Sequence, residues 1–310
     1  MSTRRCLCAL AGLIICLAFD SISARAASPY DAIYVFGDSY CDVGNIYTFT
    51  KGVIPPSPLS TPPGPYFNGR FSNGPIWVEH VASAWGLPMI ASLLGGTDYA
   101  FGGAYVTIPT NDTTIPPSVP QQVELYLTSV HGHADPKALY VIEGGGNDIL
   151  GASNVSAEYL GYEIALGISE SELLLRRAGA RNFLVPDLLD VGQLPAATAQ
   201  GAAFASFASA AAVATNNALN GLLGLEELIE GIRIQRLDVF GLFHDIAADS
   251  TVGPSSTVSH FGFTNINVPC LSPTLIPCTD PDHTLFWDAE HPTEFGHAFF
   301  AVMVETILGN

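Results

Sequence analysis

The amino-acid sequence predicts a doubly wound α/β sandwich, and three observations lead to this fold class. The chain has 310 residues, a length that suits one large α/β domain or two small ones. Apolar residues make up 48% of the chain, which is ample for a packed core. Short β-branched and aromatic runs alternate with longer segments of helical pattern, as in proteins with helices on both faces of a parallel sheet.

Five short apolar runs are the candidate strands, because their composition suits strands that are buried on both faces of a parallel sheet. They are Ala32–Phe36, Thr97–Phe101, Ala138–Glu143, Asn182–Val185 and Ile234–Val239. The candidate helices are Pro75–Trp85, Val119–Val130, Ala157–Ala178, Ala196–Leu223 and Thr293–Leu308. Residues 52–74 and 108–120 are rich in Pro, so we expect them to form long ordered loops.

The first 26 residues have the pattern of a secretory signal peptide. Arg4 and Arg5 precede an apolar run, residues 6–18, that is too short to span a bilayer comfortably. Ala24 and Ala26 then supply the small residues that a signal peptidase needs, and an uncleaved anchor is the alternative. We therefore expect residues 27–310 to be exported, to the periplasm or out of the cell, with no integral membrane segment after cleavage.

The charge balance disfavours anionic partners. The chain has 29 Asp and Glu against 11 Lys and Arg, so its formal net charge is −18. A nucleic acid would be repelled, and attraction to an anionic membrane surface has no support.

Three cysteines remain after the expected cleavage. Cys270 and Cys278 bracket a short loop, and we expect them to form a disulfide in an oxidising compartment. Cys41 is then left over as a small buried residue. Three cysteines without a CxxC pattern argue against a structural zinc site.

Glycines and polar residues follow three of the candidate strands, where ligand sites collect in such sheets. The three segments are Gly37-Asp38-Ser39, Gly102-Gly103 and Gly144-Gly145-Gly146-Asn147-Asp148, and Asp288-Ala289-Glu290-His291 comes directly before the last helix. Each motif alone is weak, since a Ser after a strand is often a turn residue or a helix N-cap. The four motifs together predict one chemistry.

That chemistry is nucleophilic attack by a serine. A free Ser hydroxyl needs a neighbouring base, which His291 can supply to Ser39, and Asp288 can orient the imidazole. The backbone N–H groups of Ser39 and Gly103 and the side chain of Asn147 can stabilise the oxyanion, each worth ~3–4 kcal/mol when removed. Gly102 is the alternative to Gly103.

In this order the four motifs resemble those of the SGNH hydrolase superfamily, also called the GDSL esterases and lipases. The resemblance runs from about Asp31 to the C-terminus. It implies a three-layer α/β/α sandwich with a flavodoxin-like sheet of about five parallel strands. It also implies a triad of Ser39, His291 and Asp288, and an oxyanion hole of Ser39, Gly103 and Asn147. One departure is Tyr40, which stands where the family name has Leu.

Further motifs are similar to the lipase-like secreted branch of that family. They are Asp42-Val43-Gly44-Asn45, the loop of residues 67–74 and Phe286-Trp287. The residues left open between an acyl pocket and the core are the aromatics Tyr66, Phe67, Phe71 and Trp77.

The sequence thus predicts a secreted hydrolase of carboxylic esters that forms an acyl-enzyme and uses no metal and no organic cofactor. Its partner would be a small-molecule or lipid ester. Alternatives are an acyltransferase, a phospholipase or a choline-ester hydrolase on the same site. An inactive binding module is a further alternative, against which the intact Ser39, Asn147, Asp288 and His291 argue.

Overall fold

The computed structural model describes residues 28–58, 64–107, 115–250 and 261–309, so the candidate signal peptide lies outside the described residues. Its centre is a sheet of four parallel strands in the order β1-β2-β3-β4. The strand β2 is buried along its whole length, as expected for a central strand of an α/β sandwich. The strands are β1 (Ile33–Phe36), β2 (Leu139–Ile142), β3 (Asn182–Pro186) and β4 (Arg233–Leu237).

The fifth candidate strand, Thr97–Phe101, lies beside β1 but joins it only by an isolated parallel bridge between Val35 and Asp98. The backbone N–H of Val35 donates to the carbonyl of Thr97, and that of Tyr99 donates to the carbonyl of Val35. The Asp98 carboxylate accepts hydrogen bonds from the backbone N–H groups of Val43 and Ala100. If the five segments are numbered along the chain, so that Thr97–Phe101 is strand 2, their order across the sheet is 2-1-3-4-5. This is the flavodoxin-like order.

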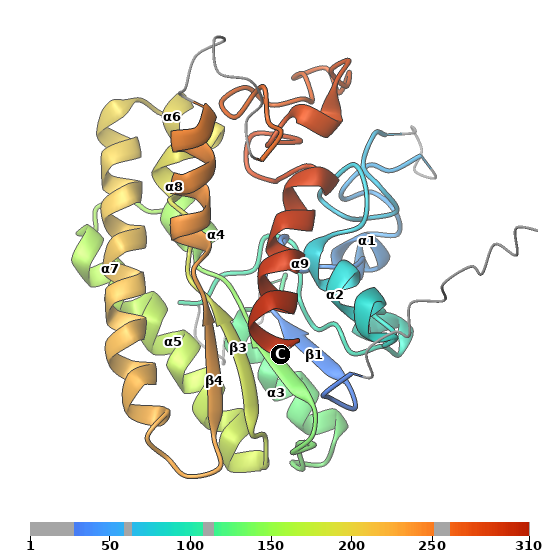
Figure 1. The fold of residues 1–310 in the computed structure, drawn as a ribbon, viewed down its shortest axis with the longest axis vertical. Helices are drawn as coiled ribbons and strands as arrows, with labels where there is room; N and C mark the ends of the chain where they lie inside the picture. The colour runs from blue at the N-terminus through green and yellow to red at the C-terminus, as the bar shows by residue number, and fades with distance from the viewer. Residues whose placement is uncertain (1–27, 59–63, 108–114, 251–260, 310) are drawn as a thin grey trace, which may run out of the picture.

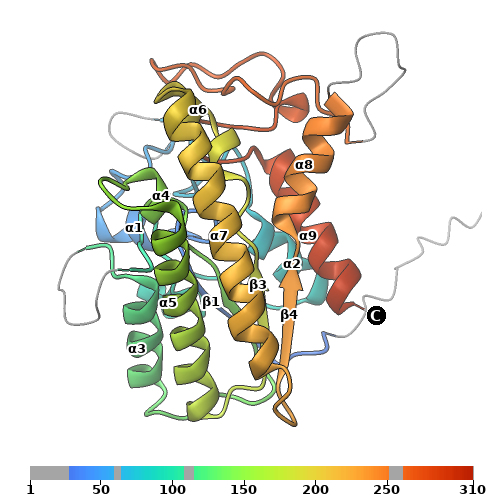
Figure 2. The same ribbon diagram turned by 90° about the vertical axis from the view of Figure 1, so that its left-hand side faces the viewer.

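Helices cover both faces of the sheet, which confirms the predicted three-layer sandwich (Figure 1, Figure 2). One layer consists of α3 (Val119–Ser129), α5 (Ala157–Ala178) and α7 (Ala202–Glu226), and the other of α2 (Trp77–Trp85), α8 (Val239–Ser250) and α9 (Glu294–Leu308). The shorter elements are α1 (Asn45–Phe49), α4 (Gly146–Leu150), α6 (Pro195–Ala199) and the 3₁₀ turns η1 (Ser92–Leu94), η2 (Val191–Gln193) and η3 (Pro281–His283).

Two elements differ from the prediction. The expected helix Ala196–Leu223 is divided into α6 and α7, because Gly201 has a φ of +98° and interrupts the helical backbone. The helix α8 was not expected. The predicted strand Ile234–Val239 ends at Leu237, where Asp238 accepts a hydrogen bond from the backbone N–H of Gly241 and starts α8 in the manner of an N-cap.

The topology selects one edge of the sheet for a ligand site. The Thr97–Phe101 segment lies on one side of β1, and β2 lies on the other side. Ligands of open α/β sheets bind at the carboxyl ends of the strands where the order reverses in this way. Among the helices that the structure describes, none combines the length and apolarity that a bilayer crossing requires.

Candidate active site

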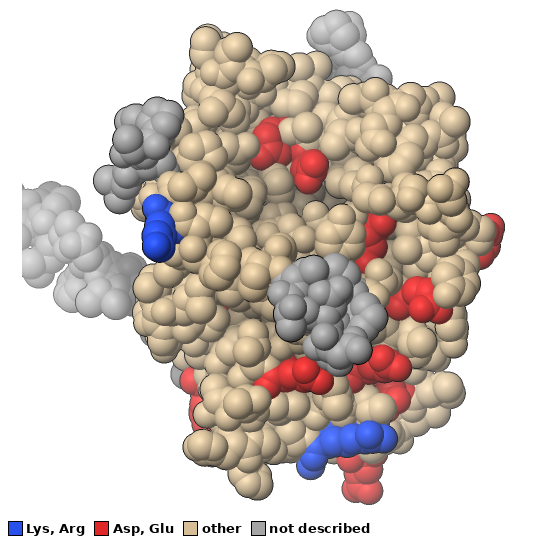
Figure 3. Space-filling view, turned by 180° about the vertical axis from the view of Figure 1, so that it is seen from behind, with Lys and Arg blue, Asp and Glu red and all other residues tan. Residues whose placement is uncertain are grey.

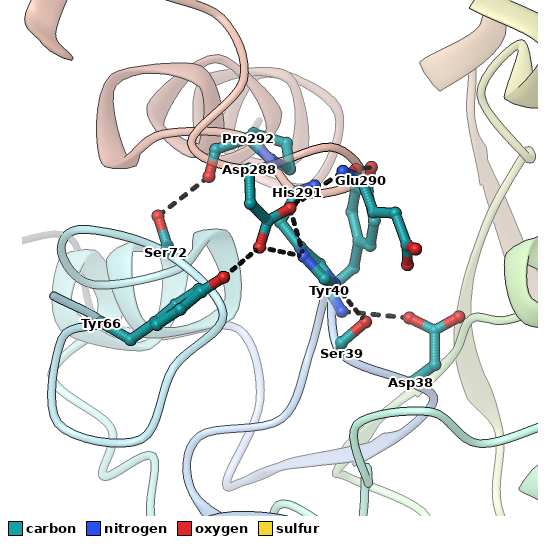
Figure 4. A network of polar contacts seen from close by, with 9 residues as sticks. All are labelled: Asp38, Ser39, Tyr40, Tyr66, Ser72, Asp288, Glu290, His291 and Pro292. Atoms are coloured by element: carbon teal, nitrogen blue, oxygen red, sulfur yellow. Dashed lines mark hydrogen bonds and ion pairs between the residues drawn. The ribbon is translucent and has the colours of Figure 1, made fainter. Parts of the chain in front are cut away.

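Ser39, His291 and Asp288 lie in direct contact at the carboxyl end of β1 (Figure 4). Ser39 lies in the turn that follows β1, and the other two residues lie in the segment before α9. Ser39 Oγ is 2.7 Å from His291 Nε2, and both carboxylate oxygens of Asp288 are 2.8 Å from His291 Nδ1. Asp288 Oδ1 also accepts the backbone N–H groups of Glu290 and His291, which holds the carboxylate in place.

Burial and charge oppose each other at these three residues. Ser39 and His291 are 6% and 7% exposed. Burial acts to lower the pKa of His291, but the charge of Asp288 and its hydrogen bond outweigh burial and raise that pKa above 6.5. Burial acts to raise the pKa of Asp288, but His291 outweighs it and lowers that pKa below 3.8. Asp288 is therefore a carboxylate at neutral pH and can hold the proton on Nδ1, leaving Nε2 to accept from Ser39.

The side chain of Asn147, in α4, connects the turn that holds Ser39 to the segment that holds Gly102 and Gly103. Its amide Nδ2 donates to Asp38 Oδ2 over 3.2 Å and to the carbonyl of Ala104 over 3.0 Å. Asp38 is the residue before Ser39, and Ala104 follows the glycine pair. The structure therefore brings these motifs to one place.

The two glycines of the second motif differ in what their backbone N–H groups do. Gly102 N donates to Asp42 Oδ2 over 2.8 Å, so this donor is already used. The N–H of Gly103 donates to no residue that the structure describes. A side chain is excluded at Gly102 by the Phe71 ring, 2.3 Å from where a Cβ would lie, and disfavoured at Gly103 by a φ of +81°.

Asp38 and Glu143 form a buried carboxyl pair beneath the serine turn. Glu143 Oε2 accepts the backbone N–H of Asp38 over 3.4 Å and lies 3.5 Å from Cys41 Sγ. Burial raises the pKa of Asp38 to about 6, and burial together with the charge of Asp38 raises the pKa of Glu143 well above its usual range, so Glu143 is the more readily protonated of the two.

Glu143 is a site residue that the sequence does not single out, because it is only the last residue of the predicted strand Ala138–Glu143. The signal was an acid at the end of an otherwise apolar run, directly before three glycines.

An apolar cavity opens beside Ser39 and extends toward the ends of β3 and β4. Acidic side chains line it at Asp38, Glu143, Asp187 and Glu290, and no Lys or Arg is among its lining residues in the described part of the chain. Its apolar walls are Trp77, Leu150, Pro186, Leu188, Leu189, Val191, Leu194, Leu237, Val239 and Phe300.

The four aromatic residues left open between pocket and core have different surroundings. Trp77 lines the cavity, whereas Phe67 lies beneath the Arg70 guanidinium, 5.9 Å from its ring centroid. The other two approach residues 288–294, here called the catalytic segment, since Phe71 packs 4.9 Å from the ring of His291 and Tyr66 Oη donates to Asp288 Oδ2 over 2.8 Å.

Tyr40, the departure from the family motif, supports the same segment. Its hydroxyl donates to the carbonyl of Glu290 over 2.5 Å, and its ring lies 5.7 Å from that of His291. A Leu could pack here but could not donate this hydrogen bond.

A disulfide between Cys270 and Cys278, as expected, closes a hairpin beside the catalytic segment. The backbone of Cys270 and Leu271 donates to the carbonyls of Phe286 and Trp287, which lead into Asp288. Cys41 is buried and unpaired. Among the described residues, no three His, Cys, Asp or Glu side chains are grouped to hold a metal ion.

An α/β sandwich with a Ser–His–Asp contact at its strand ends has the arrangement of a serine hydrolase. A protein-family model, GDSL-like Lipase/Acylhydrolase, matches residues 33–302. The chain belongs to this family, whose members act on ester bonds, as the resemblance of the four motifs indicates.

Three curated proteins illustrate the range of relatives. Lipase 1 of Photorhabdus luminescens is 34% identical over 56% of this chain and 25% of its own length. The thermolabile hemolysin of Vibrio parahaemolyticus is 25% identical over 90% of this chain and 64% of its own. A phosphatidylcholine-sterol acyltransferase of Aeromonas hydrophila is 30% identical over 60% and 52%. The chain therefore covers less than two thirds of the length of each of these relatives.

Proposed function

We propose that the protein hydrolyses carboxylic esters through an acyl-enzyme formed on Ser39. The observation that carries this proposal is the unbroken series of hydrogen bonds from Ser39 Oγ through His291 to Asp288. A serine hydroxyl becomes an effective nucleophile when a positioned imidazole accepts its proton, and the carboxylate stabilises the resulting imidazolium.

The reaction has two halves. Ser39 Oγ attacks the ester carbonyl while His291 Nε2 takes its proton, and the tetrahedral intermediate then collapses as His291 protonates the departing alcohol. The acyl group stays on Ser39. A water molecule attacks it while His291 accepts a water proton, and return of that proton to Ser39 releases the carboxylic acid.

The oxyanion of each tetrahedral intermediate would be held by the backbone N–H groups of Ser39 and Gly103 and by the amide of Asn147. The use of Gly102 N by Asp42 favours Gly103 as the glycine donor. To serve the oxyanion, Asn147 would redirect one of its two amide hydrogens, which now point to Asp38 and Ala104.

The substrate class proposed is an uncharged acyl ester whose chain enters the apolar cavity. The cavity begins at Ser39 and continues along leucine and valine side chains, which suits a hydrocarbon chain. Asp38 and Glu290, which also line the cavity, would repel an acyl group that carries its own negative charge.

Acyl transfer to an alcohol is the second candidate function. The similarity to a phosphatidylcholine-sterol acyltransferase favours it, since the same acyl-enzyme can react with an alcohol in place of water.

We further propose that residues 1–26 are a cleaved signal peptide and that residues 27–310 form one exported hydrolase domain. The basic start, short apolar run and small residues before Ala27 support this. N-terminal sequencing of the exported protein should begin at Ala27, and a retained leader would contradict export by cleavage.

The test of the proposed function is the turnover of p-nitrophenyl butyrate by the wild type and Ser39→Ala, with a competing alcohol present. We expect wild-type release of free acid and loss of activity by at least ~10³-fold in the variant, because the variant lacks the hydroxyl that contacts His291 Nε2. Retention of wild-type activity by a folded Ser39→Ala protein would contradict the proposal. An alkyl ester as the main product would instead favour the acyltransferase.

A further inference from the structure

The loop of residues 64–74, here called the clamp loop, holds the catalytic segment of residues 288–294 at three points, and Figure 4 shows the two that Tyr66 and Ser72 make. One of the three contacts reaches a proposed catalytic residue, and the other two hold the backbone that follows it. The contacts are Tyr66 Oη to Asp288 Oδ2 at 2.8 Å, Ser72 Oγ to the carbonyl of Pro292 at 3.0 Å, and the N–H of Glu294 to Asn73 Oδ1 at 2.8 Å.

The clamp loop is itself braced. The N–H of Phe67 donates to the carbonyl of Ser72 over 2.8 Å and closes the loop. Arg70 in the loop forms an ion pair of 2.6 Å with Glu79 of α2, and both side chains are only 17% exposed. A tyrosine on such a loop can keep one orientation toward Asp288.

Tyr66 can act only as a donor to Asp288. Burial, followed by the charge of Asp288, raises the pKa of Tyr66 above its ordinary value of 10, so its hydroxyl keeps its proton. The rings of Phe71 and Trp287 pack edge-on against that of Tyr66, with centroids 6.3 and 6.4 Å away.

The contact completes the coordination of the carboxylate. Asp288 Oδ1 accepts two backbone N–H groups and approaches Nδ1 of His291, whereas Oδ2 approaches the same Nδ1 and accepts the Tyr66 hydroxyl. Within the described residues, Tyr66 is the one side chain other than His291 that donates to this carboxylate.

We propose that Tyr66 is a positioning residue whose hydroxyl orients Asp288 and limits how strongly this carboxylate stabilises the protonated form of His291. The inference rests on the proposed catalytic roles of Asp288 and His291. A donor on Oδ2 draws negative charge away from the side that faces the imidazole.

The direction in which the pKa of His291 would change follows from the charge on Asp288. Tyr66→Phe removes the donor, leaves more charge facing His291 and raises the pKa of His291 further. The titratable groups that interact with His291 are Asp288, Glu290, Asp38 and His297, and the substitution changes none of them. Activity needs neutral His291, so the acidic limb of the pH profile of kcat/KM should move to higher pH.

The experiment compares Tyr66→Phe with Tyr47→Phe in the full chain. Tyr47 is a suitable control because its hydroxyl accepts a hydrogen bond of 2.8 Å from Ser57 near the same loop, and it has no contact with Asp288 among the described residues. We expect Tyr66→Phe to lower kcat/KM about tenfold at neutral pH, the effect of losing one hydrogen bond to a charged group. It should also shift the acidic limb upward and move the proton resonance of His291 Nδ1 in the NMR spectrum, while Tyr47→Phe changes neither.

Two results would overturn the inference. In the first, Tyr66→Phe has the acidic limb and the Nδ1 resonance of the wild type. In the second, Tyr47→Phe shifts both as much as Tyr66→Phe does, which would mean that loop stability alone is responsible. Ser39→Ala separates this outcome from failure of the proposed function, because an active Ser39→Ala protein contradicts the function whatever Tyr66 does.

Discussion

Asn147 shows how much of the candidate site depends on single polar side chains. Its amide contacts the turn that holds Ser39 and the segment that holds Gly103, although the chain separates these by many residues. Burial raises the pKa of the Asp38 carboxylate, which accepts from the amide, to about 6. The two contacts fix the amide beside the serine turn, and one of its hydrogens would turn from Asp38 or Ala104 to an oxyanion when substrate reacts.

Asn147→Ala should lower kcat by ~10²–10³-fold with a much smaller change in KM, because an oxyanion donor acts mainly in the transition state. The measurement is steady-state hydrolysis of p-nitrophenyl butyrate. A kcat within twofold of the wild type would exclude Asn147 from the oxyanion hole.

The residues of the proposed triad could be predicted from the sequence, but their supporting residues could not. Ser39 directly follows a predicted strand, at the edge where ligand sites collect, and the motif of Asp288 and His291 is one that the family resemblance supplied. Tyr66 contacts Asp288 only because a long loop folds back onto the catalytic segment, and no periodicity or spacing encodes that docking. Its aromatic ring fitted a pocket or a core equally well.

Among the elements, α5 and α7 are packed closely through a small residue and a charged group. A Cβ on Gly161 of α5 would lie 2.6 Å from Ala214 of α7, so only glycine allows this approach. Further along α5, Glu172 has a fully buried side chain 3.3 Å from Arg176, which also contacts Glu226 of α7. Burial, the largest cause, raises the pKa of Glu172 to about 7.

Glu172→Gln should therefore change how stability depends on pH. The folded-state pKa lies above the ordinary value of 4.5, so the stability due to protonated Glu172 is complete below about pH 4.5 and is lost as the pH rises through about 7. A neutral Gln avoids this loss. The free energy of unfolding of the variant, relative to that of the wild type, should therefore rise by on the order of 2 kcal/mol when the pH is raised from 5 to 8. Thermal unfolding at both pH values measures it.

The exposed Glu170 on the same helix provides the control, since Glu170→Gln makes the same chemical change without touching the buried Glu172 and its contact with Arg176. An equal difference in Tm between wild type and Glu172→Gln at both pH values would show that Glu172 does not titrate in this range.

Long helices and central strands were predictable as elements, and short connecting elements were not. The helix α5 has the predicted bounds because a serine N-cap and a glycine C-cap mark its ends. The helix α8 was missed because its first residues, including Val239, continue the apolar run of β4. The Thr97–Phe101 segment has a strand-like composition, but its Asp98 carboxylate binds backbone groups outside the sheet.

For the whole molecule, the order of strands explains why four distant motifs form one site. The sheet places the ends of β1 and β2 side by side, and the packing of α9 against α2 brings the preceding catalytic segment to them. Acidic side chains lie around the hollow in the face seen from behind, where basic ones are sparse (Figure 3). That distribution agrees with the formal net charge of −18.

The central claim is that Ser39 is the single activated nucleophile of this protein. The most direct measurement is peptide mapping by mass spectrometry after reaction with a fluorophosphonate, which labels serines that a neighbouring base has activated. We predict one adduct per chain, on Ser39, and no adduct in the folded Ser39→Ala variant. An adduct on another residue, or equal labelling of Ser39→Ala, would contradict the account.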